Sequence, residues 1–102
     1  MHFKRVRRLG KSYAHPLVVL VAFAIENQPL QVGVVASRAI GNAVQRNRAK
    51  RLLRAAIAPH LPHLPANYHL ILIARPPILM VKSPQVEHAL LGLLRRARLI
   101  GA

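Results

Sequence analysis

The chain has 102 residues, of which 53% are hydrophobic, so it can build one domain with a modest core but not two. Sixteen Lys and Arg residues stand against only two acidic residues, Glu26 and Glu87, and the formal net charge is +14. Because self-repulsion of this size destabilises an isolated compact chain, we expect a polyanionic partner. Twelve of the sixteen cations are Arg, which grips phosphate oxygens bidentately. This bias favours nucleic acid over an anionic membrane surface.

The sequence contains no cysteine, which excludes disulfide bonds and thiolate metal sites and is compatible with a reducing compartment. The apolar run at residues 17–25 follows a basic segment, as in a secretory signal. Only residues 17–21 precede its possible cleavage site, however, and such a signal needs ~7–15 apolar residues. No stretch reaches the ~18 apolar residues of a membrane span. We therefore expect a soluble, cytoplasmic protein without a membrane partner.

The first part of the chain predicts one helix and two strands. Residues 1–10 are basic and suit a short helix that ends at Gly10. Residues 13–25 are continuously apolar and rich in Val, which predicts a strand that bends at Pro16. The polar segment 26–29 contains a proline and is interpreted as a hairpin connection. Residues 30–37 predict the second strand.

The second part predicts a long helix, a strand and a last helix. Asn42 is a good N-cap, and residues 43–58 contain much Ala, Leu and Arg but neither Gly nor Pro. Residues 68–74 (YHLILIA) predict a third strand, and residues 86–99 a helix capped at Ser83. The order α-β-β-α-β-α predicts an α+β sandwich, one RNA-binding domain over residues 1–102, with helices packed on one mixed sheet.

The helix predicted at residues 43–58 has a polar and an apolar side. At about 100° per residue, its polar side chains fill one continuous arc of roughly 200°. They are Arg46, Asn47, Arg48, Lys50, Arg51 and Arg54. The opposite arc, which we expect to face the sheet, carries Ala49, Leu52, Leu53 and Ala56.

Most charge runs are solvated helix faces in which acidic neighbours balance the cations. This helix contains no acidic residue, and Arg46, Lys50 and Arg54 repeat every four residues, so that like charges repel along it. Such a surface costs stability unless an external polyanion covers it. The pattern therefore favours nucleic-acid binding over a merely solvated face.

Residues 37–55 read SRAIGNAVQRNRAKRLLRA. The segments GNAV, RNR and KRLLR resemble the signature of the bacterial ribonuclease P protein component family, in which this run is called the RNR motif. The resemblance extends over nearly the whole chain. It includes GKSY at 10–13, VGV at 32–34, SR at 37–38 and ILIAR at 71–75.

The resemblance implies a small protein subunit bound to a large catalytic RNA. In this family the RNA and its Mg²⁺ ions remove the 5′ leader of precursor tRNA, and the protein has no catalytic residue of its own. The Mg²⁺ is expected to be held mainly by the RNA. The resemblance also implies an unusual left-handed crossover around the signature helix.

Site residues follow from the same resemblance. The catalytic RNA is expected to contact Arg38, Arg46, Asn47, Arg48, Lys50, Arg51 and Arg54. The 5′ leader is expected to contact Phe3, Arg7, Lys11 and Phe23 in a cleft on the sheet.

The leader site departs from the family pattern at two positions. Arg7 and Val21 stand where the family commonly has aromatic residues. Phe23 lies two residues after Val21, on the same strand face, and can compensate. Family members also usually carry several more basic residues before the position of Phe3. We therefore expect leader binding here to be more electrostatic.

Other candidate chemistry is weak. His60 and His63 have the spacing of a metal pair, but prolines surround them and no acidic residue lies nearby, which suggests exposed loop histidines. Glu26 and Glu87 alone make an acid–base pair or a Mg²⁺ site improbable. We expect neither a metal site nor a small-molecule substrate.

An alternative function is that of a structural RNA-binding protein of the ribosomal type, which would share the size and charge of this chain. The signature between Gly41 and Arg54 favours the ribonuclease P family. Cleavage of precursor tRNA together with the catalytic RNA distinguishes the two.

Overall fold

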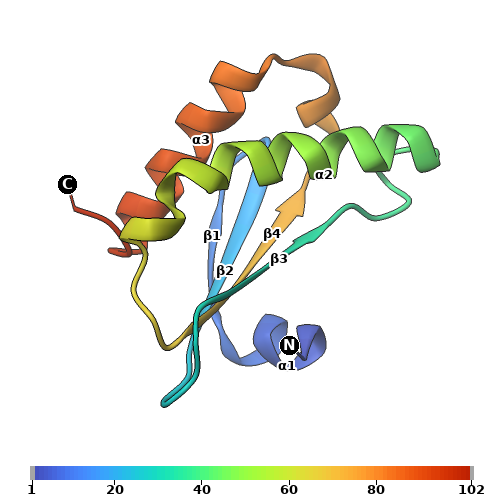
Figure 1. The fold of residues 1–102 in the computed structure, drawn as a ribbon. Helices are drawn as coiled ribbons and strands as arrows, with labels where there is room; N and C mark the ends of the chain where they lie inside the picture. Colours follow the sequence, from blue (N-terminus) through green and yellow to red (C-terminus); the bar gives the residue numbers. More distant parts are fainter. Residues whose placement is uncertain (1, 102) are drawn as a thin grey trace.

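The computed structural model describes residues 2–101, in which a four-stranded mixed sheet lies between two helical layers (Figure 1). Helices α2 and α3 cover one face and the short α1 lies against the other. The strand order is β1-β2-β4-β3. The elements are α1 (Phe3–Leu9), β1 (Lys11–Ala14), β2 (Val18–Ala24), β3 (Gln31–Val35), α2 (Ala43–Ile57), β4 (Tyr68–Ala74) and α3 (Ser83–Arg96). Two 3₁₀ helices, Ala58–His63 and Pro76–Met80, connect them.

The predicted α+β class is confirmed, and so are the long helix and the third strand. α2 begins after Asn42 and ends where the prolines begin, because a proline in a helix interior lacks the N–H that the ladder needs. β4 matches its predicted bounds. The parallel strands β3 and β4 are neighbours joined through α2, which is the crossover that the resemblance implies. Its left-handed sense stays a prediction.

The strand predicted over residues 13–25 is wrong, because this segment is a β-hairpin. β1 and β2 pair antiparallel, with Ala14 opposite Val19. His15 and Val18 exchange both backbone hydrogen bonds, at 3.0 and 3.3 Å, across a two-residue turn. Pro16 is the first of the turn residues, where its fixed φ suits a tight reversal. The proline therefore reverses the chain instead of bending it.

The predicted hairpin connection at residues 26–29 is also wrong, because β4 inserts between β2 and β3. Leu70, Ile71 and Leu72 of β4 are fully buried, as expected of a central strand that is covered on both faces. The connection passes the start of β4, where Asn67 N donates to Gln28 O at 2.9 Å and Ile25 N donates to Asn67 O at 2.8 Å. These bonds replace those of a hairpin.

The last helix begins and ends earlier than predicted. Its N-cap is Lys82, not Ser83, because the Lys82 N–H donates to Gln85 Oε1 at 2.8 Å. At the other end, Arg98 adopts a left-handed backbone (φ 58°) and Leu99 N donates to Leu94 O at 3.0 Å. This is the hydrogen bond that closes many helix C-termini, and it stops α3 at Arg96.

The core consists of two unequal clusters separated by the sheet. The larger lies between the sheet and helices α2 and α3, and it includes Leu20, Leu53, Leu72 and Leu90. The smaller lies under α1 and has three buried members, which are Val6, Val21 and Ile71. Within residues 2–101, none of the helices has the length and apolar character needed to cross a membrane.

Candidate nucleic-acid interface

Helix α2 divides into a buried and an exposed side, as its sequence predicts. The apolar side is buried against the core through Ala49, Leu53, Ala56 and Ile57, whereas Leu52 is only half-buried. The polar side faces outward. Asn47, Arg48, Arg51 and Arg54 are exposed, and Arg46 and Lys50 are half-buried. All six polar residues predicted to bind RNA on α2 therefore share one surface, called here the cationic face of α2.

The N-terminus of α2 is held by a capping box. Asn42 Oδ1 accepts from Gln45 N, and Gln45 Oε1 accepts from Asn42 N, each at 2.9 Å. Gly41 has φ 141°, and a Cβ on it would overlap Gln45 Oε1, so that the capping box needs glycine at this position. Arg38 is exposed in the turn before this cap and adds a cation at the positive end of the helix dipole. Local sequence thus positions both the helix start and Arg38.

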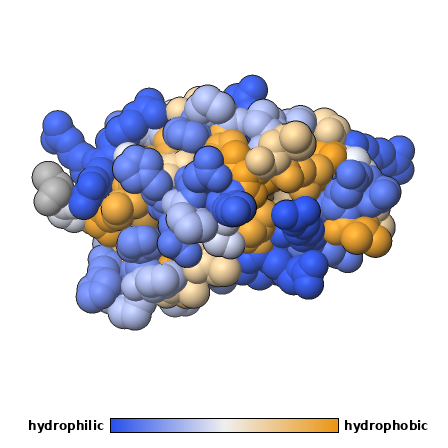
Figure 2. Space-filling model, turned by 90° about the horizontal axis from the view of Figure 1, so that it is seen from above, coloured by the Kyte–Doolittle hydropathy of each residue, from blue (hydrophilic) through white to orange (hydrophobic). Residues whose placement is uncertain are grey.

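The cationic face of α2 forms a shallow recess of about 410 Å³, lined by Val44, Asn47, Arg51 and Arg54. Val44 is 75% exposed, so apolar surface lies among the guanidinium groups. Figure 2 views the molecule from the side of α2 and α3 and shows hydrophilic residues with apolar residues between them. The phosphates of a polyanion can therefore bind guanidinium groups of this helix, while its apolar parts contact Val44 on the same helix.

The acidic residues lie away from one another. Glu26 is in the turn after β2 and Glu87 is near the start of α3, and both are exposed. These two places are at opposite ends of the sheet (Figure 1). The five cations of α2 have no acidic partner on their own helix, and within residues 2–101 no two carboxylates converge.

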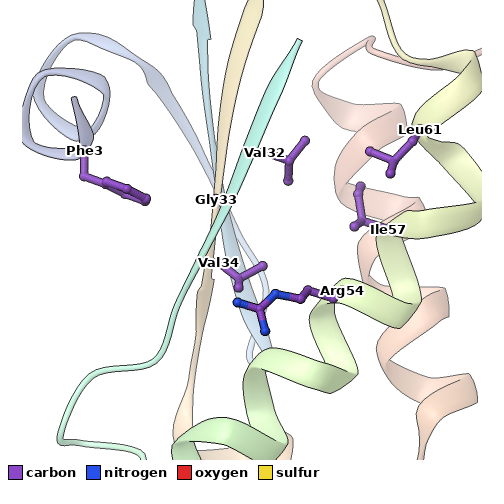
Figure 3. A pocket seen from close by; sticks show the side chains of 7 residues that line it. All are labelled: Phe3, Val32, Gly33, Val34, Arg54, Ile57 and Leu61. Carbon is purple, nitrogen blue, oxygen red and sulfur yellow. The ribbon is translucent and has the colours of Figure 1, made fainter. Parts of the chain in front are cut away.

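A groove of about 400 Å³ at the free edge of β3 joins α1 to α2. In Figure 3, Phe3 approaches Gly33 from the α1 side, whereas Arg54 reaches from α2 towards Val34. Phe3 is 41% exposed and Leu61, on the α2 side, is 40% exposed. Because Gly33 has no side chain, a ligand in the groove can contact both Phe3 and the backbone of the edge strand β3. The sequence analysis did not foresee this groove, because its residues come from three segments that are far apart in the chain.

Helix α1 places two of the predicted leader residues side by side. Phe3 and Arg7 are exposed and one helical turn apart, a spacing that puts them on the same side of the helix. Val6 is buried and fastens α1 to the sheet against Val21 and Ile71. Phe23 is half-buried and packs against the same cluster. Phe3, Arg7 and Phe23 therefore belong to the α1 face of the sheet.

Lys11 does not join them. It lies opposite Ala22 in the antiparallel pair of β1 and β2, and directly opposed residues point to the same face. Ala22 packs against the larger cluster, on the face of α2 and α3. Because Phe23 is the next residue of β2, its side chain points to the other face. The side chains of Lys11 and Phe23 therefore point to opposite faces, although both residues line one recess beside β1 and β2.

The α1 face holds one polar residue that the sequence analysis missed. His69 is 5% exposed, and its Nε2 has no hydrogen-bond partner among the described residues. It lines a recess of about 290 Å³ together with His2, Arg5, Val6, Ile25, Gln28 and Gln31. The available signal was a histidine in an otherwise apolar strand, YHLILIA.

His60 and His63 lie in the 3₁₀ helix that follows α2. His60 is half-buried and His63 is exposed. Over residues 2–101, no group of three or more His, Asp or Glu side chains is arranged to hold a metal ion.

Comparisons with known proteins agree with this geometry. The model of the Ribonuclease P family matches residues 1–98. The ribonuclease P protein component of Chloroflexus aurantiacus is 37% identical, over 98% of this chain and 75% of the relative. That of Brevibacillus brevis is also 37% identical, over 96% of this chain and 79% of the relative.

Solved structures show the same fold. The Staphylococcus aureus RNase P protein has a TM-score of 0.85 and 29% identity, with 97% of this chain and 91% of that chain covered. The Thermotoga maritima RNase P protein has a TM-score of 0.81 and 25% identity, over 93% and 90% of the two chains. These matches favour the ribonuclease P family over the ribosomal-type alternative. The chain with this cationic helix belongs to the family of bacterial ribonuclease P protein components, the protein subunit of the ribonucleoprotein that processes the 5′ ends of tRNA.

Proposed function

We propose that the cationic face of α2 is the surface that binds the catalytic RNA, and that the α1 face binds the 5′ leader of precursor tRNA. The observation that carries the first assignment is the set of five cations on α2 without an acidic residue on the same helix. Arg38 extends this surface beyond the helix start. Phosphates of the RNA backbone relieve the repulsion along the helix and supply the missing counter-charge.

The proposed contacts on α2 are mainly electrostatic. Arg48, Arg51 and Arg54 are exposed and can each grip a phosphate bidentately. Arg46 and Lys50 lie at one edge of the polar arc, where they are half-buried and keep less freedom to reorient. Asn47 lies in the same recess as Arg51 and Arg54, where its amide can bind RNA groups that a cation cannot distinguish.

Leader binding is proposed to involve Phe3, Arg7 and Phe23. Unpaired nucleotides are commonly held by stacking on exposed aromatic rings beside cations. Phe3 supplies an exposed ring and Arg7 a cation one turn away. The groove at β3 also contains Arg54, so a strand lying on Phe3 comes close to the cationic face of α2. This continuity supports a path for the leader beside the bound catalytic RNA.

The hydrolytic chemistry is proposed to belong to the RNA. Endonucleolytic cleavage of the precursor requires Mg²⁺, and hard cations prefer clustered oxygen ligands. Glu26 and Glu87 do not fit such a site, because they lie at opposite ends of the sheet. We propose that Mg²⁺ is held mainly by the RNA, that the protein has no small-molecule substrate, and that it acts in the cytoplasm, where its RNA partners are.

The test compares two double variants with the same charge change. Replacing Arg48 and Arg51 by Ala should weaken binding to the catalytic RNA. It should also lower the slope of log affinity against log salt by about 0.7–0.9 for each lost phosphate contact. The control replaces Lys82 and Arg95, which are exposed cations of the α3 region, by Ala. It should change the slope little.

Equal losses of RNA affinity and salt slope in the two double variants would show that binding depends on the total charge of the protein rather than on the cations of α2. A functional measurement accompanies the binding assay: 5′ processing of precursor tRNA at low Mg²⁺, with the catalytic RNA and with or without the protein. Stimulation by the native chain, reduced in the Arg48 and Arg51 variant, is the expected result.

A further inference from the structure

A third recess lies at the β1–β2 side of the sheet, and it contains no residue of the cationic face of α2. It has a volume of about 360 Å³ and lies where β1, β2 and the start of β4 meet the end of α3. Its lining includes Lys11, Tyr13 and Tyr68, with Ala22 and Ala24 between them, and also Leu9 and Phe23. The hollow exists because the two alanines are smaller than the residues opposite them on the adjacent strands.

The strand pairing puts both tyrosines on one face. Tyr13 lies opposite Leu20 and Tyr68 lies opposite Ala24, and residues 20, 22 and 24 alternate onto the same side of β2. Both tyrosines pack their inner parts against the larger core cluster and are half-buried. Two aromatic rings therefore flank a hollow floored by small side chains.

Lys11 is the one charged residue that lines this recess, and it is exposed. The end of α3 lies against β1 beside it, since Arg96 Nη1 donates to Ala14 O at 2.9 Å. Ala97, the next residue, lines the recess, and the exposed Arg98 follows. The rim is thus positively charged, and the interior is aromatic and apolar.

We propose that this recess binds one unpaired RNA nucleotide, with its base against Tyr13 and Tyr68 and its phosphate at Lys11. Stacking on aromatic rings beside a cation is the way proteins hold single-stranded nucleic acid with little regard to sequence. Phe23 also lines the recess, so the site adjoins the proposed leader surface, and the inference extends that proposed function to Tyr13 and Tyr68. The nucleotide comes either from the catalytic RNA or from the precursor, since both offer the same chemistry.

The chain provides its own reporter for this site. Tyr13 and Tyr68 are its only tyrosines, and it contains no tryptophan. Tyrosine emission of the full chain therefore reports on the recess alone. The probes are a short uridine oligonucleotide and an abasic oligonucleotide of the same length and charge. We expect the first to quench the emission and to bind about 5- to 100-fold more tightly than the second.

Variants separate stacking from charge. Tyr68→Leu should abolish most of the preference for the oligonucleotide with bases, whereas Tyr68→Phe should retain it because the ring remains. Met80→Ala removes an exposed apolar side chain from the 3₁₀ helix Pro76–Met80, outside every proposed RNA surface, and should leave the quenching unchanged. Lys11→Gln should weaken both oligonucleotides alike. Equal quenching by the abasic probe, or an unchanged preference in Tyr68→Leu, would overturn the proposal.

The source of the nucleotide is found by testing Tyr68→Leu with the natural RNAs. Weaker binding to the catalytic RNA alone assigns the nucleotide to that RNA. Weaker binding of the assembled ribonucleoprotein to precursor tRNA, with catalytic-RNA binding unchanged, assigns it to the precursor. A loss in neither assay contradicts a nucleotide site of this ribonucleoprotein. The readout is independent of α2, so failure of the Arg48 and Arg51 test leaves this test intact.

Discussion

The two faces of the sheet are covered to different extents, and the difference separates stability from binding. On one face, α2 and α3 bury a continuous cluster that includes Leu53, Leu72 and Leu90. On the other face, seven-residue α1 buries three side chains, and its neighbours Val19, Phe23, Val35 and Ile73 are only half-buried. The first face holds the fold together, whereas the second leaves apolar and aromatic surface free for a ligand.

The same comparison explains why one RNA surface is easier to recognise than the other. The cationic face of α2 lies within one helix, so its periodicity of about 3.6 residues is visible in the sequence. The α1 face is assembled from α1, β2, β3 and β4, which are far apart along the chain. Only the packing of these segments brings Phe3, Phe23 and His69 to one side.

The largest expected effect tests the two clusters directly. Ile71 and Leu72 are neighbours on β4, both fully buried, and they point to opposite faces. Replacing either by Ala should cost about 2–5 kcal/mol of unfolding free energy. The loss should be larger for Leu72→Ala, because the two long helices that enclose the new cavity cannot easily move to fill it. The short α1 can shift to fill the cavity that Ile71→Ala leaves. Urea unfolding at constant salt measures both, and a larger loss at Ile71 would contradict the comparison.

The attachment of α1 is tested at Gly10, where a Cβ would lie 2.6 Å from Val6 O and 2.9 Å from Ala22 O. Gly10→Ala should therefore push α1 from the sheet and cost about 1–3 kcal/mol. It should also weaken binding of precursor tRNA. Gly92→Ala is the matched control, because nothing lies within 4 Å of its added Cβ in the exposed part of α3. The control should stabilise the protein by about 0.5–1 kcal/mol.

Phe3→Ala sharpens the assignment of the α1 face to the leader. Loss of one stacking ring should weaken binding of precursor tRNA to the ribonucleoprotein by about 1–3 kcal/mol. Mature tRNA without a leader should bind as before. Met80→Ala removes an exposed apolar residue outside the proposed RNA surfaces and should have little effect. An equal loss with mature tRNA would place Phe3 outside the leader contact.

The smallest expected effect concerns the start of α2. Asn42→Ala removes the bond from Gln45 N and should cost about 1 kcal/mol of stability, whereas Asn42→Ser should retain most of it. Catalytic-RNA affinity should change little in either variant, because the cations of α2 remain in place. Urea unfolding and a salt titration of RNA binding measure the two effects. A large loss of affinity would indicate that Asn42 contacts the RNA itself.

Two errors of the sequence analysis have a common cause. The hairpin at Pro16 and the insertion of β4 between β2 and β3 both concern which strands pair, and pairing is decided by residues distant in sequence. A usable signal was present in YHLILIA, whose continuous apolar run is typical of a central strand. The side of the sheet on which Lys11 lies could not be predicted for a related reason. Successive side chains of a strand point to alternate faces, so the face to which Lys11 points depends on its pairing with Ala22.

The sequence by itself determined the elements whose bonds are local. The helix α2 follows from its capping box, its composition and the prolines after it, and its cationic face follows from the helical period. The signature in that helix also determined the family. The tertiary structure alone decided which side chains share a face of the sheet: Phe23 points to the α1 face, whereas Lys11, Tyr13 and Tyr68 point to the face of α2 and α3. Strand order and register depend on contacts between distant segments, and neither leaves a periodic pattern in the chain.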